Sequence, residues 1–172
     1  MDKTPLAPRV GKSMLILFWL GLLALLTLGF DSWQQHLFNP NASPQSARVG
    51  NVVEVALKGN RQGHYLVSGA INGRPVTFLI DTGATYVAIP DELQQELGLT
   101  PGRAQRVVTA NGTATAYETK LNSVSIGDIK VQEVRAALVP NMPGRQVLLG
   151  MSVLKEIEFV HRADTLTLRQ YQ

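Results

Sequence analysis

The chain has 172 residues and a formal net charge of +3, enough for one domain of ordinary size and a short additional segment. It contains no cysteine, which excludes a disulfide framework, catalysis by a thiol and metal sites built from thiolates. Residues 31–172 carry 13 basic and 12 acidic side chains with no basic run, so we expect no nucleic-acid partner.

A Leu-rich run without charge occupies residues 13–30. About 20 apolar residues span a bilayer, so this run of 18 residues predicts a transmembrane anchor. A cleaved signal peptide is the alternative reading. Its apolar core is typically about 7–15 residues long and ends in a small-x-small site, and the stretch from Leu28 to Trp33 is a poor cleavage site.

The distribution of basic residues predicts the orientation of this anchor. Lys3, Arg9 and Lys12 precede the run, and the first basic residue after it is Arg48. By the positive-inside rule, residues 1–12 form a cytoplasmic tail, and the residues after the anchor lie on the opposite side of the membrane. We therefore expect a single-pass inner-membrane protein whose domain is periplasmic or extracytoplasmic.

Two further segments follow the anchor. Residues 31–50 are rich in Asn, Pro, Ser and Gln without an apolar period, which predicts a flexible tether. In residues 51–172, short β runs alternate with turns, which predicts a mainly β domain of the barrel or sandwich class with one or two short helices. The expected strands are residues 52–57, 65–71, 76–80, 86–89, 106–110, 113–119, 121–126, 129–139, 157–161 and 165–169, and the expected helices are residues 90–98 and 151–156.

The most informative segment joins an apolar run, residues 78–80, to Asp81-Thr82-Gly83-Ala84. Burying a carboxylate is costly unless it is paired or hydrogen-bonded, so an aspartate placed after a buried strand indicates a chemical role. Asp-Thr-Gly alone is a weak motif, because it also fits a strand end where Asp caps a turn and Gly takes a positive φ.

The surrounding sequence strengthens the chemical interpretation. About 30 residues after Asp81, the run around Asn111-Gly112 predicts a hairpin, and Leu148-Leu149-Gly150 later leads into a short helix. The Asp-Thr-Gly-Ala turn, the hairpin and the Leu-Leu-Gly segment follow one another in this order. Over residues 51–172, this arrangement resembles the retropepsin-like aspartic proteases, and more specifically their bacterial membrane-anchored members. The resemblance implies a single-lobe acid-protease barrel preceded by one transmembrane helix. It assigns Asp81 as the catalytic residue, Thr82, Gly83 and Ala84 as the active-site loop, Ala110, Asn111 and Gly112 as the flap that covers substrate, and Leu148, Leu149 and Gly150 as the supporting segment.

The chemistry implied by this resemblance needs two carboxylates about 3 Å apart that share one proton. One acts as a base toward the attacking water, and the other protonates the carbonyl oxygen of an extended peptide or protein substrate. No metal and no cofactor is implied. The chain has one such aspartate and is too short for a duplicated lobe, so function demands a homodimer in which two Asp81 residues meet on a two-fold axis.

One departure from the viral pattern affects the dimer. Retroviral enzymes carry an Asp four residues after the catalytic one and an Arg after the late glycine, and these positions here are Thr85 and Met151. Because both partners of that ion pair are missing, no lone buried charge remains. We expect weaker dimerisation than in the viral enzymes.

Two other functions remain open at this point. The first is a non-catalytic module of the same fold that binds an extended peptide or dimerises, and the second is a membrane-tethered structural domain with a coincidental motif. Both differ from the enzyme in their response to an inhibitor that mimics the tetrahedral intermediate, since only a paired-carboxylate site should bind it.

Overall fold

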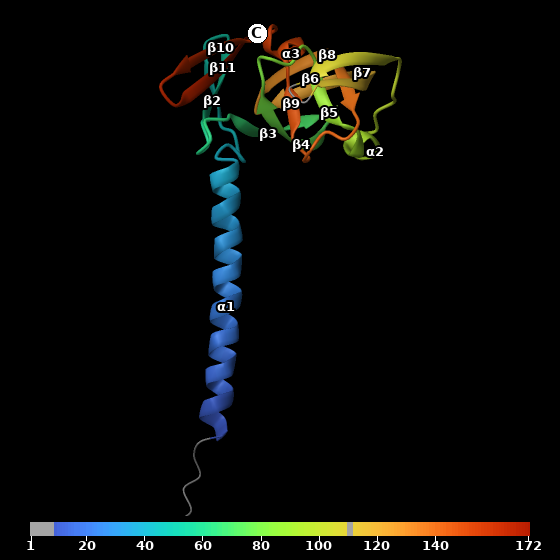
Figure 1. Cartoon of the computed structure of the whole chain (residues 1–172). Coiled ribbons are helices and arrows are strands. Elements are labelled where there is room, and N and C mark those ends of the chain that lie inside the picture. The colour runs from blue at the N-terminus through green and yellow to red at the C-terminus, as the bar shows by residue number, and fades with distance from the viewer. Residues whose placement is uncertain (1–8, 110–111) are drawn as a thin grey trace, which may run out of the picture. The chain divides into compact units, whose positions relative to one another are not determined.

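The computed structural model describes residues 9–109 and 112–172. The chain divides into two compact units, the first ending at Leu37 and the second covering Phe38–Gln172. The elements of both are labelled in Figure 1.

The first unit contains one long helix, α1 (Arg9–Phe38). Its segment Ser13–Phe30 has a mean hydropathy of 2.3 and is long and apolar enough to cross a membrane, a test that an N-terminal signal sequence also passes. The helix continues eight residues beyond Phe30, into the segment expected to be a flexible tether. No Gly or Pro interrupts residues 31–38, and the helix stops just before Asn39-Pro40, where a proline disfavours helical backbone in the preceding residue.

The rest of the expected tether is attached to the second unit. Asn39 and Asn41 are 7% and 6% exposed, and β1 (Ser46–Val49) pairs antiparallel with β2 (Val52–Lys58). Residues 31–50 therefore contain a helical end, a hydrogen-bonded segment and a strand, which their polar composition did not indicate.

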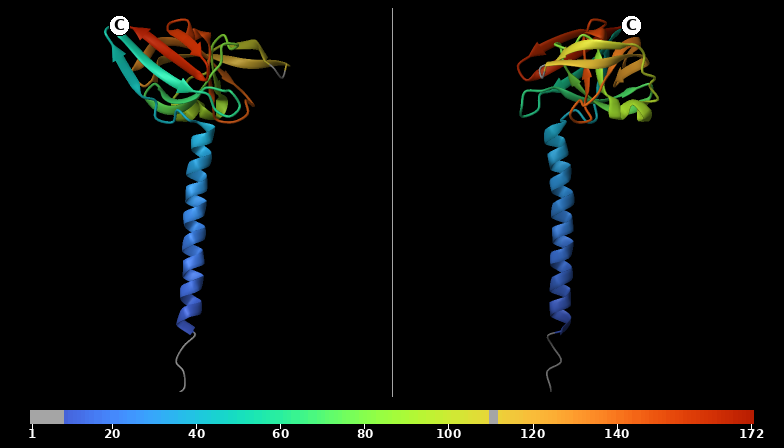
Figure 2. Two further views of the ribbon diagram at one scale, coloured as in Figure 1. Left: turned by 90° about the vertical axis from the view of Figure 1, so that its left-hand side faces the viewer. Right: turned by 45° about the vertical axis from the view of Figure 1, so that its right-hand side comes forward.

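Two sheets form the second unit. The smaller has the order β1-β2-β11-β10 and is antiparallel throughout, with β10 (Glu158–Arg162) and β11 (Thr165–Tyr171) as its C-terminal hairpin. The cyan and red strands of this sheet lie side by side in the left-hand view of Figure 2. The larger sheet has the order β3-β4-β9-β5-β8-β7-β6. Its strands are β3 (Leu66–Ile71), β4 (Arg74–Ile80), β5 (Val87–Pro90), β6 (Ala104–Thr109), β7 (Gly112–Ile126), β8 (Ile129–Val139) and β9 (Val147–Leu149).

Local sequence signals explain several connections. Asn72 and Gly73 join β3 to β4 with φ values of 52° and 79°, the left-handed pair that a tight two-residue hairpin requires. β7 is one strand of 15 residues, whereas two strands were expected. Lys120, which separated them in the sequence, lies within the ladder opposite Arg135 of β8.

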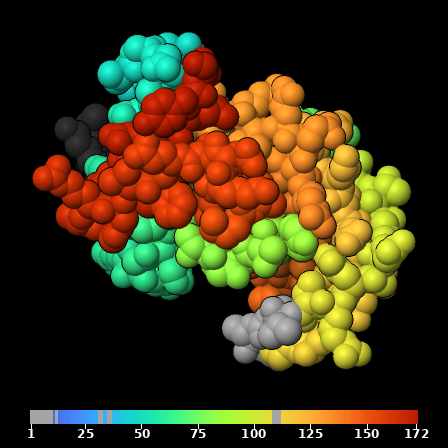
Figure 3. All heavy atoms as spheres, turned by 90° about the horizontal axis from the view of Figure 1, so that it is seen from above, coloured from blue at the N-terminus to red at the C-terminus, as the bar shows by residue number. Residues whose placement is uncertain are grey.

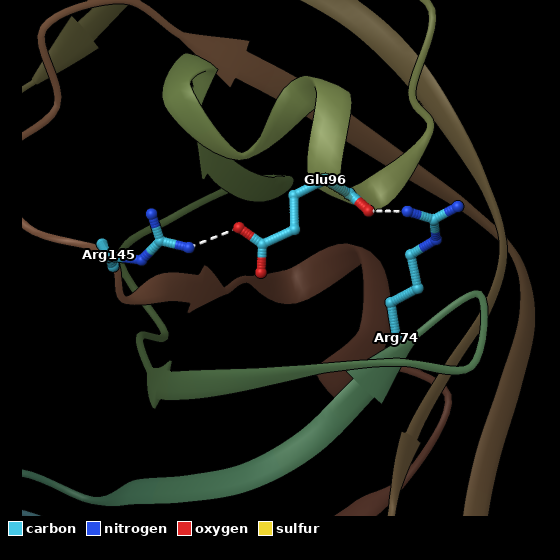
Figure 4. Close-up of polar contacts among 3 residues, drawn as sticks. All are labelled: Arg74, Glu96 and Arg145. Atoms are coloured by element: carbon cyan, nitrogen blue, oxygen red, sulfur yellow. Dashed lines mark hydrogen bonds and ion pairs between the residues drawn. The ribbon is translucent and has the colours of Figure 1, made fainter.

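The helices of the domain are short. A 3₁₀ turn, η1 (Asp91–Leu93), runs into α2 (Gln94–Leu97), which ends at Gly98 with a left-handed φ of 64°. α3 (Met151–Leu154) follows β9. Figure 4 shows Glu96 of α2 between two arginines. Its carboxylate pairs with Arg145 of the β8–β9 loop, and its carbonyl accepts a hydrogen bond from Arg74 at the start of β4.

The core joins both sheets and the short helices. Phe78, Leu57 and Ile71 are among its largest fully buried side chains, and one continuous cluster also includes Leu97, Leu149 and Leu168. The mainly β fold class with short helices that the sequence predicted is confirmed.

Candidate active site

The site begins where β4 ends. Phe78 of β4 is fully buried, and β9 runs parallel to β4 with Ile80 opposite Leu149. The next residue, Asp81, donates its backbone N–H to the carbonyl of Leu149 at 3.2 Å. The apolar run thus anchors the strand in the core, and the aspartate emerges at its carboxyl end.

A tight turn holds the carboxylate of Asp81. Its Oδ1 accepts the backbone N–H of Gly83 at 2.9 Å, and its carbonyl accepts the N–H of Ala84 at 3.3 Å. Asp81 and Ala84 are half-buried, while Thr82 and Gly83 are exposed. Within residues 9–109 and 112–172, no side chain donates a hydrogen bond to this carboxylate and the Thr82 hydroxyl has no partner.

Gly150 packs directly against the backbone at the end of this turn. A Cβ at Gly150 would overlap the carbonyl oxygens of Ala84 and Tyr86, so no larger residue fits. The following residues tie the two segments together, since Met151 N–H donates to Ala84 O at 2.8 Å and Ser152 N–H donates to Thr85 O at 3.0 Å. The structure thus brings Leu149 and Gly150 against residues 81–84, whereas Leu148 lies opposite Leu79 of β4 and Ala88 of β5.

Ser152 is a supporting residue that the sequence did not reveal. Its hydroxyl donates to the carbonyl of Arg135 at 2.8 Å and accepts the N–H of Val87 at 3.1 Å. It therefore connects β8 to the start of β5, just after the Asp81 turn. The guanidinium of Arg135 also lies 4.8 Å from the centroid of the Tyr86 ring. Ser152 and Arg135 are 17 residues apart, on α3 and β8. Only folding brings them together, so no local sequence motif marks the pair.

The hairpin expected to form the flap is present as β6 and β7, whose paired residues run from Ala104↔Tyr117 to Thr109↔Gly112. Gly112 is exposed with a φ of 109°. Ala110 and Asn111, at the expected tip, lie outside the described residues. A groove of about 400 Å³ beside this hairpin is lined by Tyr86, Gln105, Glu118 and Arg135, among others, and Asp81 is not among its lining residues.

Chemically, this arrangement presents one carboxylate, held by backbone hydrogen bonds at the carboxyl end of a buried strand, with an exposed Thr-Gly pair next to it. In the part of the chain that the structure describes, no three His, Asp or Glu side chains lie close enough together to hold a metal ion. One carboxylate alone cannot perform the two-carboxylate reaction that the resemblance implies.

Comparisons with known proteins match the part of the chain that contains the Asp81 turn and Gly150. A family model described as gag-polyprotein putative aspartyl protease matches residues 67–156. An uncharacterized protein in the cobV 5′ region of a Sinorhizobium species is 35% identical over 120 residues, which are 67% of this chain and 52% of that protein. An uncharacterized protein of Rickettsia prowazekii (strain Madrid E) is 34% identical over 85 residues, 48% of this chain and 36% of that protein. The chain thus spans about half or less of these curated relatives.

Among solved structures, a retropepsin-like aspartic protease from Rickettsia conorii superposes with a TM-score of 0.59 at 29% identity. The match covers 74% of this chain and 96% of that one. The matched family segment, residues 67–156, contains the Asp81 turn, β9 and Gly150.

Proposed function

Because the chain belongs to the gag-polyprotein putative aspartyl protease family, with a retropepsin-like fold, we propose that it is a membrane-anchored, homodimeric aspartic endopeptidase with Asp81 as its catalytic residue. One observation carries the proposal: the Asp81 carboxylate is held by the Gly83 N–H in a turn that Gly150 supports from below. That arrangement fixes a polar group at the end of a buried strand while leaving its neighbours Thr82 and Gly83 exposed.

In the proposed dimer, two copies of Asp81 face each other across a two-fold axis and share one proton. The ionised carboxylate takes a proton from a water, the resulting nucleophile attacks the scissile carbonyl, and the protonated carboxylate donates to the carbonyl oxygen. The carboxyl that took the water's proton then protonates the nitrogen, while the other carboxylate takes a hydroxyl proton from the tetrahedral intermediate. The C–N bond breaks, which releases the amine and the new carboxylic acid and restores the shared proton. The Thr82 hydroxyls, without partners in the described part of one chain, hydrogen-bond across the dimer and hold the two loops together.

Substrate binds as an extended strand in this proposal. Gly83 and Ala84 allow the peptide backbone to approach closely, and residues 110–112 at the end of the β6–β7 hairpin fold over it. Such binding uses backbone hydrogen bonds for affinity and side-chain pockets for selectivity.

The N-terminal helix supplies the membrane anchor in this proposal. Residues 1–12 are cytoplasmic, residues 13–30 span the inner membrane, and the domain lies on the periplasmic side, as the basic residues before the span favour. Confining two copies to one membrane raises their effective concentration, which compensates for a weak dimer. It also places substrates among membrane or envelope proteins.

The test compares the full chain in detergent micelles with its Asp81→Asn variant. Asparagine keeps the size of the side chain and an oxygen that accepts the Gly83 N–H, so the fold should survive while the base is lost. We expect wild type to cleave an unfolded protein substrate, at a rate that rises faster than linearly with enzyme concentration, and Asp81→Asn to be inactive.

The alternative functions give different results. A peptide-binding module of the same fold would dimerise, cleave nothing in either form, and fail to bind an inhibitor that mimics the tetrahedral intermediate. Equal cleavage by wild type and Asp81→Asn would mean that Asp81 is not the catalytic residue.

A further inference from the structure

The loop between β2 and β3, residues 59–65, closes onto the chain where α1 ends. Its turn is built on Asn60, whose Oδ1 accepts the backbone N–H groups of Gln62 and His64 at 2.9 and 3.0 Å. The backbone N–H of Asn60 donates to the His64 carbonyl at 2.8 Å. The Nδ2 of Asn60 donates to the carbonyl of Phe38 at 3.4 Å. The loop is therefore held next to the last residue of α1.

The turn between β10 and β11 lies beside this loop. The N–H of Gly59 donates to the carbonyl of Asp164 at 3.1 Å, and Lys58, the last residue of β2, lies opposite Thr165 of β11. In Figure 3 the red C-terminal hairpin and the blue-green residues of the loop lie side by side at one end of the domain. We call the surface that the two segments form the basic end, and it comprises residues 58–64 and 161–164.

The basic end carries positive charge that no acid neutralises through an ion pair. Lys58, Arg61 and Arg162 are exposed, and Asp164 is the one acid among its residues. With neutral histidines, three cations and one acid give a formal charge of +2. None of the three cations forms an ion pair within the described residues. The cations that do pair with acids in the described chain lie elsewhere: Lys120, Arg145, Lys155 and Arg169.

The proposed anchor keeps the basic end close to a membrane. Eight helical residues follow Phe30, the end of the apolar run, and reach Phe38, a rise of about 12 Å at about 1.5 Å per residue. The headgroup layer on each face of a bilayer is about 5–8 Å thick, and charges interact over about 8 Å at physiological ionic strength. Because Asn60 is hydrogen-bonded to Phe38, the cations of the basic end lie within reach of the headgroups.

We propose that the basic end docks on anionic phospholipid headgroups of the membrane that α1 spans. The inference rests on the proposed function, which places α1 in a membrane. Each Lys or Arg near an anionic membrane surface strengthens attachment about fivefold, so these cations convert a tethered domain into a surface-bound one. The tether favours lipid over an acidic protein as the occupant, because it holds headgroups next to the cations at a high effective concentration.

Docking of the basic end also fixes where the candidate site lies. Tyr65, the last residue of the loop, accepts the N–H of Ile80 at 3.0 Å, and Asp81 follows Ile80 directly. The Asp81 turn therefore begins next to a residue that is hydrogen-bonded to the loop. A docked domain holds this turn beside the membrane surface, so we expect it to cleave membrane-proximal segments of its substrates.

The test uses the full chain in lipid nanodiscs with a single cysteine as the reporter. The chain has no native cysteine, so Gln62→Cys carries one fluorophore in the basic end, and a quencher on the lipid headgroups reports its proximity. We expect stronger quenching in an equal mixture of phosphatidylcholine and phosphatidylglycerol than in phosphatidylcholine alone, and we expect added salt to remove the difference.

A second labelling position is the control for this reporter. Asn122 is exposed and precedes Ser123, whose carbonyl accepts the N–H of Asn72 at the far end of β3 from the loop. We expect a fluorophore at Asn122→Cys to be quenched equally in both lipids.

Charge reversal identifies the residues that dock. Arg61→Glu and Arg162→Glu each replace an attractive charge by a repulsive one, so we expect each to weaken docking about twentyfold. Neither side chain has a hydrogen bond or ion pair within the described residues, so the fold should survive. Lys130→Glu, which reverses an exposed cation of β8, is the matched control and should dock like wild type. Asp81→Asn should also dock like wild type, because docking needs no cleavage.

The outcomes separate this inference from the proposed function. Equal quenching of the Gln62→Cys label in both lipids, or equal loss in Arg61→Glu and Lys130→Glu, would overturn docking by the basic end and leave the anchor intact. A chain that separates from the nanodiscs would contradict the anchor and this inference with it. Docking by a chain that cleaves nothing would retain the inference and contradict the endopeptidase. If a water-soluble maleimide is excluded from the Gln62→Cys thiol in native membranes but not in nanodiscs, the occupant is an acidic protein and the lipid assignment is wrong.

Discussion

At the scale of single residues, the candidate site depends on Gly150, where no side chain fits. The backbone of Gly150, with φ −88° and ψ −174°, is accessible to any amino acid, so no conformational strain demands glycine there. The requirement is steric, since two carbonyl oxygens occupy the place of a Cβ. The motif Leu148-Leu149-Gly150 was recognisable from the sequence, but the reason for its glycine became visible only in the fold.

Replacing Gly150 by alanine should therefore move the Asp81 turn away from β9. We expect Gly150→Ala to destabilise the domain by about 1–3 kcal/mol, the usual cost of overpacking, and to abolish cleavage. Denaturant unfolding and the cleavage assay would measure the two effects. Gly29→Ala, at a glycine of α1 with open space around it, is the matched control and should change neither.

At the scale of elements, the segment after α1 is held by one amide side chain. Asn41 donates its Nδ2 to the carbonyls of Lys58 at 2.9 Å and Leu66 at 2.6 Å, and its Oδ1 accepts the Lys58 N–H at 2.8 Å. It therefore joins the end of β2 to the start of β3. Its own N–H donates to Asn39 Oδ1 at 3.0 Å, which closes the turn that follows the helix.

Removing this side chain should leave buried backbone groups of β2 and β3 without partners. We expect Asn41→Ala to lower the free energy of unfolding by about 2–4 kcal/mol, since each unsatisfied buried group costs about 1–3 kcal/mol. Thermal or denaturant unfolding of the full chain would show it. Ser43→Ala, two residues away and exposed, should be neutral, and a neutral result for Asn41→Ala would mean that water replaces the three hydrogen bonds.

These elements also show where prediction from sequence succeeds and fails. Asn72-Gly73 and Gly98 have residue types that favour a left-handed backbone, so the strand expected over residues 65–71 and the helix expected over residues 90–98 end close to where the structure ends β3 and α2. Asn41 and Ser152 act through partners far away in the chain, and nothing local marks an asparagine or a serine as a bridge. The helix through Phe38 was missed because polar composition suggested a tether, although the segment contains no residue that stops a helix.

At the scale of the whole molecule, the domain is predicted to be delivered across a membrane by α1. If the span is an uncleaved anchor, the mature protein keeps its N-terminus and stays in the membrane fraction after alkaline extraction. We expect alkaline phosphatase fused after Gln172 to be active and a fluorescent protein that folds only in the cytoplasm to be dark.

The controls for this prediction follow from the same segment. Reversing Lys3, Arg9 and Lys12 to glutamate should reduce phosphatase activity, because the positive residues hold the N-terminus in the cytoplasm. A mature chain that begins after Phe30, as intact-mass measurement would reveal, would instead identify the helix as a signal sequence.

The position of β11 in the smaller sheet determines when that sheet can form during synthesis of the chain. β11 lies between β2 and β10, and its last residues pair with the first residues of β2, Tyr171 opposite Val52. A ribosome makes β2 more than a hundred residues before β11, so this sheet cannot close on a nascent chain, and such distant pairing is slow to form. β10, whose strand partner in the described chain is β11, is likewise unpaired until β11 has been made. In the proposed function, cleavage needs two folded copies, so we expect a chain in which β11 has not yet been made to be inactive.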